Sequence, residues 1–91
     1  MKIQPGSLVK LRGDAFGINV YGGHFRFLWS EATNGSYYNG KFLDTDFAIV
    51  IASLSRKQRW LGPNYARNGV FVMLCGTHTV GWISDEDLVV A

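Results

Sequence analysis

Hydrophobic and polar positions alternate along much of this chain. Residues 7–12 carry Leu8 or Val9 at the start of an apolar face, with Lys10 and Arg12 directed to water. In residues 24–29 the aromatic side chains again fall on every second position. A period of two residues is typical of strands with one buried face. No segment combines helical periodicity with caps at both ends, so we expect mostly β structure.

Two apolar runs predict more deeply buried strands. Residues 47–52 are rich in branched side chains and bounded by polar residues, which is typical of a central strand. Residues 69–75 form a continuous apolar run, which predicts a strand buried on both faces or nearly so. Residues 30–40 contain two Asn-Gly steps and residues 55–68 contain Gly62-Pro63-Asn64, so we expect loops there, the first as a hairpin tip or an extended loop.

The C-terminal segment predicts how the sheet closes. A short strand at residues 80–83 leads into a polar turn, and a brief apolar strand follows at residues 88–90. This closing pattern resembles that of small SH3-like barrels, in which the last turn tucks one aromatic residue and one Leu under the sheet, and we expect at most one 3₁₀ turn near residues 84–87. We also expect the final strand to pair back toward the first.

Four segments occur in an order that resembles a known family. They are residues 5–11, residues 48–51, residues 72–76, and the closing residues 81–83 with 87–89. This order resembles that of small SH3-like proteins encoded by tailed bacteriophages, over less than half of the chain. The chain departs from their pattern at Ser7, where Asp is usual, and in two large insertions at residues 25–42 and 55–68. The resemblance implies a single all-β domain over residues 1–91, an SH3-like barrel of five to six strands with two enlarged loops. It also implies a role in particles or in binding rather than in catalysis.

Composition supports a protein that associates with others. Apolar residues make up 47% of the 91 residues, whereas charged residues make up only 18%, against about 25% in typical soluble domains. A small barrel cannot hide so many apolar side chains, so some must be exposed or covered by another chain. The net charge of +2 is too small to define a partner.

The candidate partner-binding residues lie in two loops that combine aromatic and cationic side chains. Trp, Tyr and Arg dominate the energetics of protein interfaces, so we favour docking on protein subunits, including further copies of this chain. The alternative is a nucleic-acid-binding barrel that uses residues 56–67, because cations neutralise phosphates and aromatic rings stack on bases. A third class is an inhibitor of a host enzyme that uses the same loops. The candidate residues are Tyr37, Tyr38, Arg56, Lys57, Arg59, Trp60, Tyr65 and Arg67.

An acidic segment, Asp85-Glu86-Asp87, has two interpretations. The simpler one is a solvated turn in which one carboxylate caps a 3₁₀ turn. The other is a contact with the basic loop of a second copy, which would favour head-to-tail or ring assembly.

Catalysis has little support in the sequence, and we expect neither an enzyme nor a cofactor. Cys75 lies in an apolar run and is expected to be a buried, inert thiol, and no serine lies in a nucleophile-elbow pattern. His24 and His78 lack the further ligands of a zinc site, so no metal is expected.

The targeting signals are equally sparse. The N-terminus has no hydrophobic stretch of signal-peptide length, and no segment approaches the ~20 apolar residues of a membrane span. We therefore expect an intracellular (host cytoplasm) or virion protein that is not secreted by a signal peptide and has no membrane partner.

Overall fold

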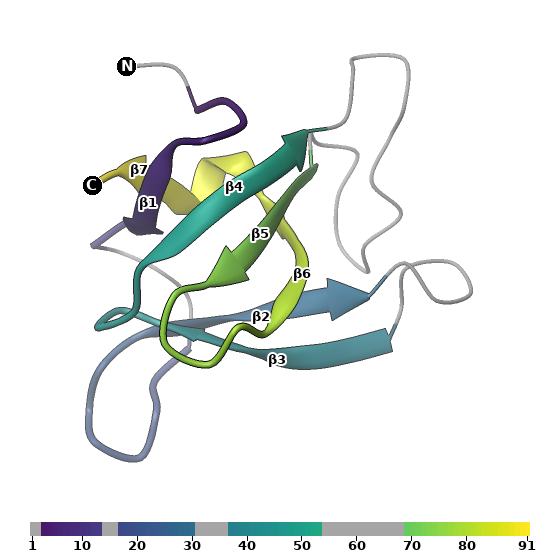
Figure 1. Ribbon diagram of the computed structural model, residues 1–91. Helices are drawn as coiled ribbons and strands as arrows, with labels where there is room; N and C mark the ends of the chain where they lie inside the picture. Colours follow the sequence, from purple (N-terminus) through teal and green to yellow (C-terminus); the bar gives the residue numbers. More distant parts are fainter. Residues whose placement is uncertain (1–2, 14–16, 31–36, 54–68) are drawn as a thin grey trace.

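The fold is a single curled antiparallel sheet of seven strands that forms a half-barrel (Figure 1). The computed structural model describes residues 3–13, 17–30, 37–53 and 69–91. The strands lie in the order β3-β2-β6-β5-β4-β1-β7. Their bounds are β1 (Leu8–Leu11), β2 (Phe25–Ser30), β3 (Tyr37–Leu43), β4 (Ala48–Ser53), β5 (Gly69–Leu74), β6 (Val80–Ser84) and β7 (Leu88–Val90).

The closing strand pairs with the first, as the sequence predicts. Val9 lies opposite Val90, and Leu11 lies opposite Leu88, in an antiparallel pair of β1 and β7. The predicted central strand is also confirmed, because β4 lies between β5 and β1. The all-β class is therefore confirmed.

The core fills the concave side of the curled sheet. Alternate positions of the strands point there, as the period of two requires. The inward side chains are Val9, Leu11, Leu28, Phe42, Ala48, Val50, Val70, Val72, Leu74, Ile83 and Leu88. Gly81 also lies on this side, where a Cβ atom would come within 2.8 Å of the Leu28 Cβ atom. A side chain at position 81 would therefore displace part of the core.

The prediction of a loop over residues 30–40 is wrong for residues 37–40, because β3 occupies residues 37–43. The strand count consequently rises from the predicted five to six to seven. The β2–β3 register shifts between Leu28 and Trp29, which leaves Asn39 without an opposite residue. The Asn39 side-chain amide instead donates to the Val80 carbonyl oxygen of β6. The first Asn-Gly step lies outside the described residues. The second, Asn39-Gly40, lies at this bulge within β3 and does not end the strand.

The predicted burial of the closing aromatic residue is confirmed, and the predicted burial of Cys75 is wrong. Trp82 is only 6% exposed, but it alternates with the core residue Ile83 and packs on the other side of the sheet against Phe71. Leu88 does enter the core as expected. Cys75 is exposed because β5 ends at Leu74 and the next residue starts a turn, where its backbone N–H donates to the Phe47 carbonyl oxygen.

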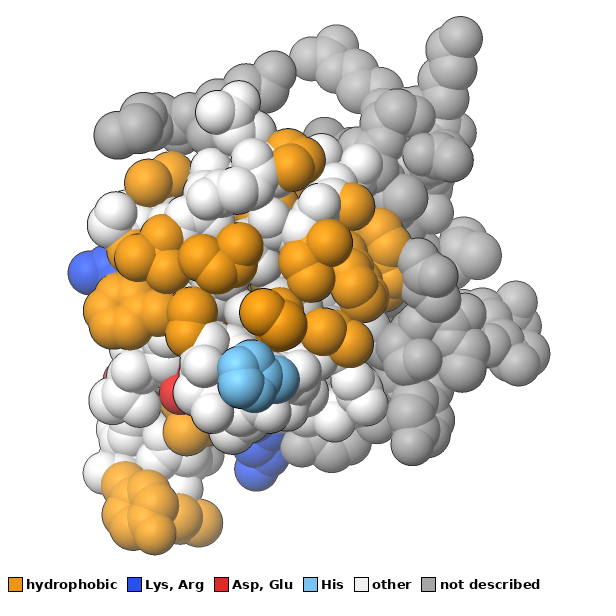
Figure 2. All heavy atoms as spheres, viewed as in Figure 1, with side chains coloured by type: hydrophobic (Ala, Val, Ile, Leu, Met, Phe, Trp, Pro, Cys, Tyr) orange, Lys and Arg blue, Asp and Glu red, His pale blue; other side chains and the backbone are white. Residues whose placement is uncertain are grey.

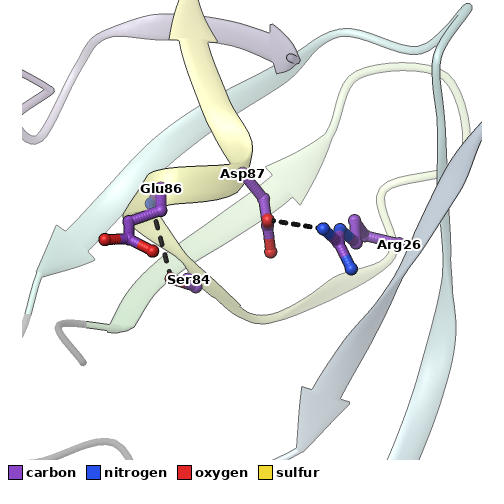
Figure 3. A network of polar contacts seen from close by, with 4 residues as sticks. All are labelled: Arg26, Ser84, Glu86 and Asp87. Atoms are coloured by element: carbon purple, nitrogen blue, oxygen red, sulfur yellow. Dashed lines mark hydrogen bonds and ion pairs between the residues drawn. The ribbon is translucent and has the colours of Figure 1, made fainter. Parts of the chain in front are cut away.

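The acidic segment forms the expected 3₁₀ turn, η2 (Asp85–Asp87). Its cap is the Ser84 hydroxyl, which accepts a hydrogen bond from the Glu86 N–H at 3.4 Å, and not a carboxylate (Figure 3). The Asp87 carboxylate instead pairs with Arg26, with 3.0 Å between Nη2 and Oδ1. Arg26 belongs to β2 and Asp87 directly precedes β7, so this ion pair links strands from opposite ends of the sheet order.

Candidate functional site

The most distinctive surface of the described residues is the convex side of the sheet, opposite the core. One row of apolar side chains crosses four strands there. Leu8 lies opposite Ile49, Ile49 lies opposite Met73, and Met73 lies opposite Val80. Directly opposite residues in antiparallel strands share a face, so these four side chains form a continuous row.

A second row is mostly aromatic. Phe71 lies opposite Trp82, and Trp82 lies opposite Trp29. The Phe71 and Trp82 rings are 5.1 Å apart between centroids. Along β2 the row continues with edge-to-face contacts, at 5.7 Å between Trp29 and Phe27 and 5.2 Å between Phe27 and Phe25. The predicted common face of the β2 aromatic residues is thus confirmed.

We call these two rows, together with Ile51, the outer face. Ile51 is the extra residue where the β4–β5 register shifts, and it is 45% exposed. Leu8 and Phe27 are each 40% exposed, and Phe47, next to the start of β4, is 48% exposed. Figure 2 shows hydrophobic side chains gathered in a band over β1, β4 and β5. Exposed apolar patches of this kind mark interaction sites more often than chance, because burying them in a partner releases water.

The charged side chains near the outer face lie at its border and not at its centre. No residue of β4, β5 or β6 carries a charge. The neighbouring cations are Lys10, two residues from Leu8 on β1, and Lys41, which lies opposite Phe27 on β3. The Lys41 Nζ atom lies 4.7 Å from the centre of the Phe25 ring, a cation–π contact. The described strands therefore present an apolar centre bordered by cations.

Trp82 places one polar atom beneath this surface. Its indole Nε1 is buried and has no hydrogen-bond partner among the described residues. An indole N–H can only donate, so this atom favours an acceptor close to the aromatic row.

The sequence-predicted site residues fall largely outside the part of the chain that the structure describes. Tyr37 and Tyr38 lie on β3, opposite Ser30 and Trp29, and only their backbone is described. The basic loop, with Arg56, Lys57, Arg59, Trp60, Tyr65 and Arg67, lies outside the described residues. These residues stay predictions. The outer face was not among the predicted sites, although the spacing of Phe25, Phe27 and Trp29 was its signal.

Other site types find little support in the described ranges. No group of three His, Cys, Asp or Glu side chains there could hold a metal ion. His24 lies at a strand start, bridged to Ile18, and His78 lies in the β5–β6 turn with a φ angle of 60°. Among the described residues, no helix is sufficiently long and apolar to span a bilayer.

Comparison with known proteins does not assign the chain to a family. No family model matches it, and searches of curated proteins and of solved structures also gave no match. The function must therefore be inferred from the surface itself.

Proposed function

We propose that this protein is a non-enzymatic docking module that binds other protein subunits through its outer face. The observation that carries this proposal is the apolar surface that crosses four strands, from Leu8 to Val80, with no charge on β4, β5 or β6. The centres of protein interfaces are depleted in charge and enriched in aromatic residues and Met, which matches this composition.

The apolar composition of the chain supports the same conclusion. The exposed fractions of Leu8, Phe27 and Ile51 are all at or above 40%, so the fold leaves part of its apolar excess in contact with water. Covering each such side chain by a partner stabilises the complex by up to about 1.5–3 kcal/mol when burial is complete. The cations at the border would steer and orient the partner.

The finer assignment rests on the resemblance noted in the sequence. We propose that the half-barrel is an SH3-like barrel of a bacteriophage structural or accessory protein, acting in the host cytoplasm or the virion. The β1–β7 pairing and the 3₁₀ turn before the last strand support this architecture.

Site-specific photocrosslinking tests the docking function. A benzophenone amino acid replaces Ile51 on the outer face in one variant and Glu86 in the other, since Glu86 is an exposed residue of η2. In cells that make the protein, we expect a discrete protein adduct with the Ile51 variant and a much weaker one with the Glu86 variant. Equal, diffuse crosslinking at both positions would overturn the proposal.

The aromatic row favours a second candidate, a barrel that binds single-stranded nucleic acid. Phe25, Phe27 and Trp29 on a sheet face beside Lys41 are the residue types that stack bases and contact phosphates. Titration with short DNA and RNA, followed by tryptophan emission, separates the candidates. Quenching that fades as salt is added would favour nucleic acid, whereas an apolar protein interface should depend little on salt.

A further inference from the structure

The loop between β1 and β2 exposes large apolar side chains to an unusual degree. Val20 is 92% exposed, Tyr21 is 93% exposed and Ile18 is 69% exposed. The loop stands out from the body of the sheet at the lower left of Figure 1, and hydrophobic atoms occupy the same place in Figure 2. We call residues 17–23 the tip loop.

Hydrogen bonds hold the tip loop in one conformation. The Asn19 N–H donates to the Gly23 carbonyl oxygen at 2.7 Å, and the Gly22 N–H donates to the Asn19 carbonyl oxygen at 2.9 Å. The Asn19 side chain accepts from the Tyr21 N–H at 2.7 Å. Gly22 supplies the positive φ angle, 86°, that the turn requires.

A rigid turn with exposed apolar side chains is suited to binding. Because the backbone is already ordered, little conformational entropy is lost when Val20 and Tyr21 become buried. Tyrosine also contributes a large contact area with few rotatable bonds, and it is enriched among the residues that dominate interface energetics.

We propose that the occupant of the outer face is a second copy of this chain, whose tip loop packs on it in a reciprocal dimer. This inference rests on the proposed docking function and specifies its partner. In a two-fold dimer each tip loop would cover the other copy's outer face. The hydrophobic band over β1, β4 and β5 and the tip loop are both visible from the same side of the molecule in Figure 2, so one approaching copy can meet both.

The area of the two surfaces agrees with such a dimer. An exposed tyrosine offers about 200 Å², and each branched aliphatic side chain offers about 100 Å². One tip loop against one outer face would bury roughly 800 Å² in total, which is below the size of a stable interface. Two reciprocal contacts would bury about 1,600 Å², the standard size of a specific protein complex.

The charges also agree. The Asp44 carboxylate lies at the base of the tip loop, where its Oδ2 atom accepts from the His24 N–H at 3.0 Å, and Asp44 is exposed. The outer face is bordered by Lys10 and Lys41. A tip loop placed on the outer face of another copy therefore brings an acidic side chain toward a cationic border.

Sedimentation velocity over a range of concentrations tests the dimer. We expect the wild-type chain to reach twice the monomer mass at tens of micromolar. The paired change Val20→Ser/Tyr21→Ser should weaken the dimer at least tenfold, and so should Ile51→Lys. Leu8→Lys is a second outer-face variant, and Glu86→Gln is the matched control that should still dimerise. Circular dichroism verifies that each variant is folded.

Mixing the variants identifies which surfaces meet. The tip-loop variant keeps an intact outer face, and the Ile51→Lys variant keeps an intact tip loop. A heterodimer keeps one intact contact, whereas a homodimer of either variant keeps none, so an equimolar mixture should associate more strongly than either variant alone but more weakly than the wild-type chain. The proposal would be overturned if the Val20→Ser/Tyr21→Ser variant dimerised as strongly as the wild-type chain. It would also be overturned if the wild-type chain formed assemblies larger than a dimer.

A wild-type chain that stays monomeric at high concentration would also overturn it. The docking function is judged separately by the photocrosslink at Ile51. An adduct with a different protein, together with a monomeric wild type, would retain the docking function and reject the dimer. If neither an Ile51 adduct nor a wild-type dimer were found, both the docking function and the dimer would be rejected.

Discussion

Trp29 of β2 lies directly opposite Trp82 of β6, at the junction where the β2–β3 hairpin joins the rest of the sheet. On the convex side the two indoles continue the aromatic row. On the concave side the neighbouring residues, Leu28 and Gly81, meet closely in the core. The same junction therefore supports the core and builds the outer face.

Gly81→Ala should destabilise the protein by about 1–3 kcal/mol, because small-to-large changes in a packed core force backbone shifts. The added Cβ would lie 2.8 Å from the Leu28 Cβ atom and 3.2 Å from the Trp29 carbonyl oxygen. Urea unfolding followed by tryptophan emission measures the change. Gly76→Ala is the matched control, since a Cβ there meets nothing within 4 Å. Equal midpoints for the two variants would contradict the close approach.

The Arg26–Asp87 pair should contribute to closure of the half-barrel. Both side chains are largely buried, at 21% and 13% exposure, so water screens the pair less than a surface pair. A double-mutant cycle with Arg26→Ala and Asp87→Ala should give a coupling free energy of about 1–2 kcal/mol in urea unfolding. Glu86→Gln, on the exposed residue beside it, should change stability by less than about 0.5 kcal/mol. A coupling near zero would mean that the pair does not hold β2 and β7 together.

The Cys75 thiol should react in the folded protein. The side chain is exposed in the turn after β5, so a thiol reagent reaches it without unfolding. We expect one equivalent to react in native buffer at a rate close to that in urea, as followed by absorbance. If the Cys75 thiol reacted only after unfolding, it would be buried, as the sequence predicted.

Much of the fold follows from the two-residue period. The alternation of residues 7–12, the branched residues of 47–52 and the apolar closing segment predicted strands that the structure confirms as β1, β4 and β7. These strands depend on local pattern, which the sequence carries directly. The β1–β7 pairing was instead expected from the way small SH3-like barrels close.

The structure differs from the sequence prediction where tertiary contacts determine the local conformation. Asn39-Gly40 is a strong turn signal, but the bond from the Asn39 amide to Val80 keeps it within β3. Cys75 continues an apolar run, but the chain turns one residue earlier than the run ends. Neither cross-strand bonds nor the point at which a strand ends can be read from hydrophobicity alone.

The outer face was not predicted from the sequence, for a related reason. In β4 and β5 both faces are apolar, so the pattern does not distinguish the core side from the exposed side. Only the register places Leu8, Ile49 and Met73 in one row. The almost complete exposure of Val20 and Tyr21 in the tip loop likewise could be seen only in the structure.

Oxidative footprinting of Met73 tests the docking role of the outer face most directly. Met73 lies in the apolar row, and Cys75, two residues later, lies in the turn and serves as an internal reference. The rate of Met73 oxidation is measured by peptide mass spectrometry in the dilute purified chain and in extracts of cells that make the protein. We predict strong protection of Met73 in the extract while alkylation of Cys75 keeps its rate. Equal Met73 oxidation rates in both samples would show an uncovered outer face and contradict the account.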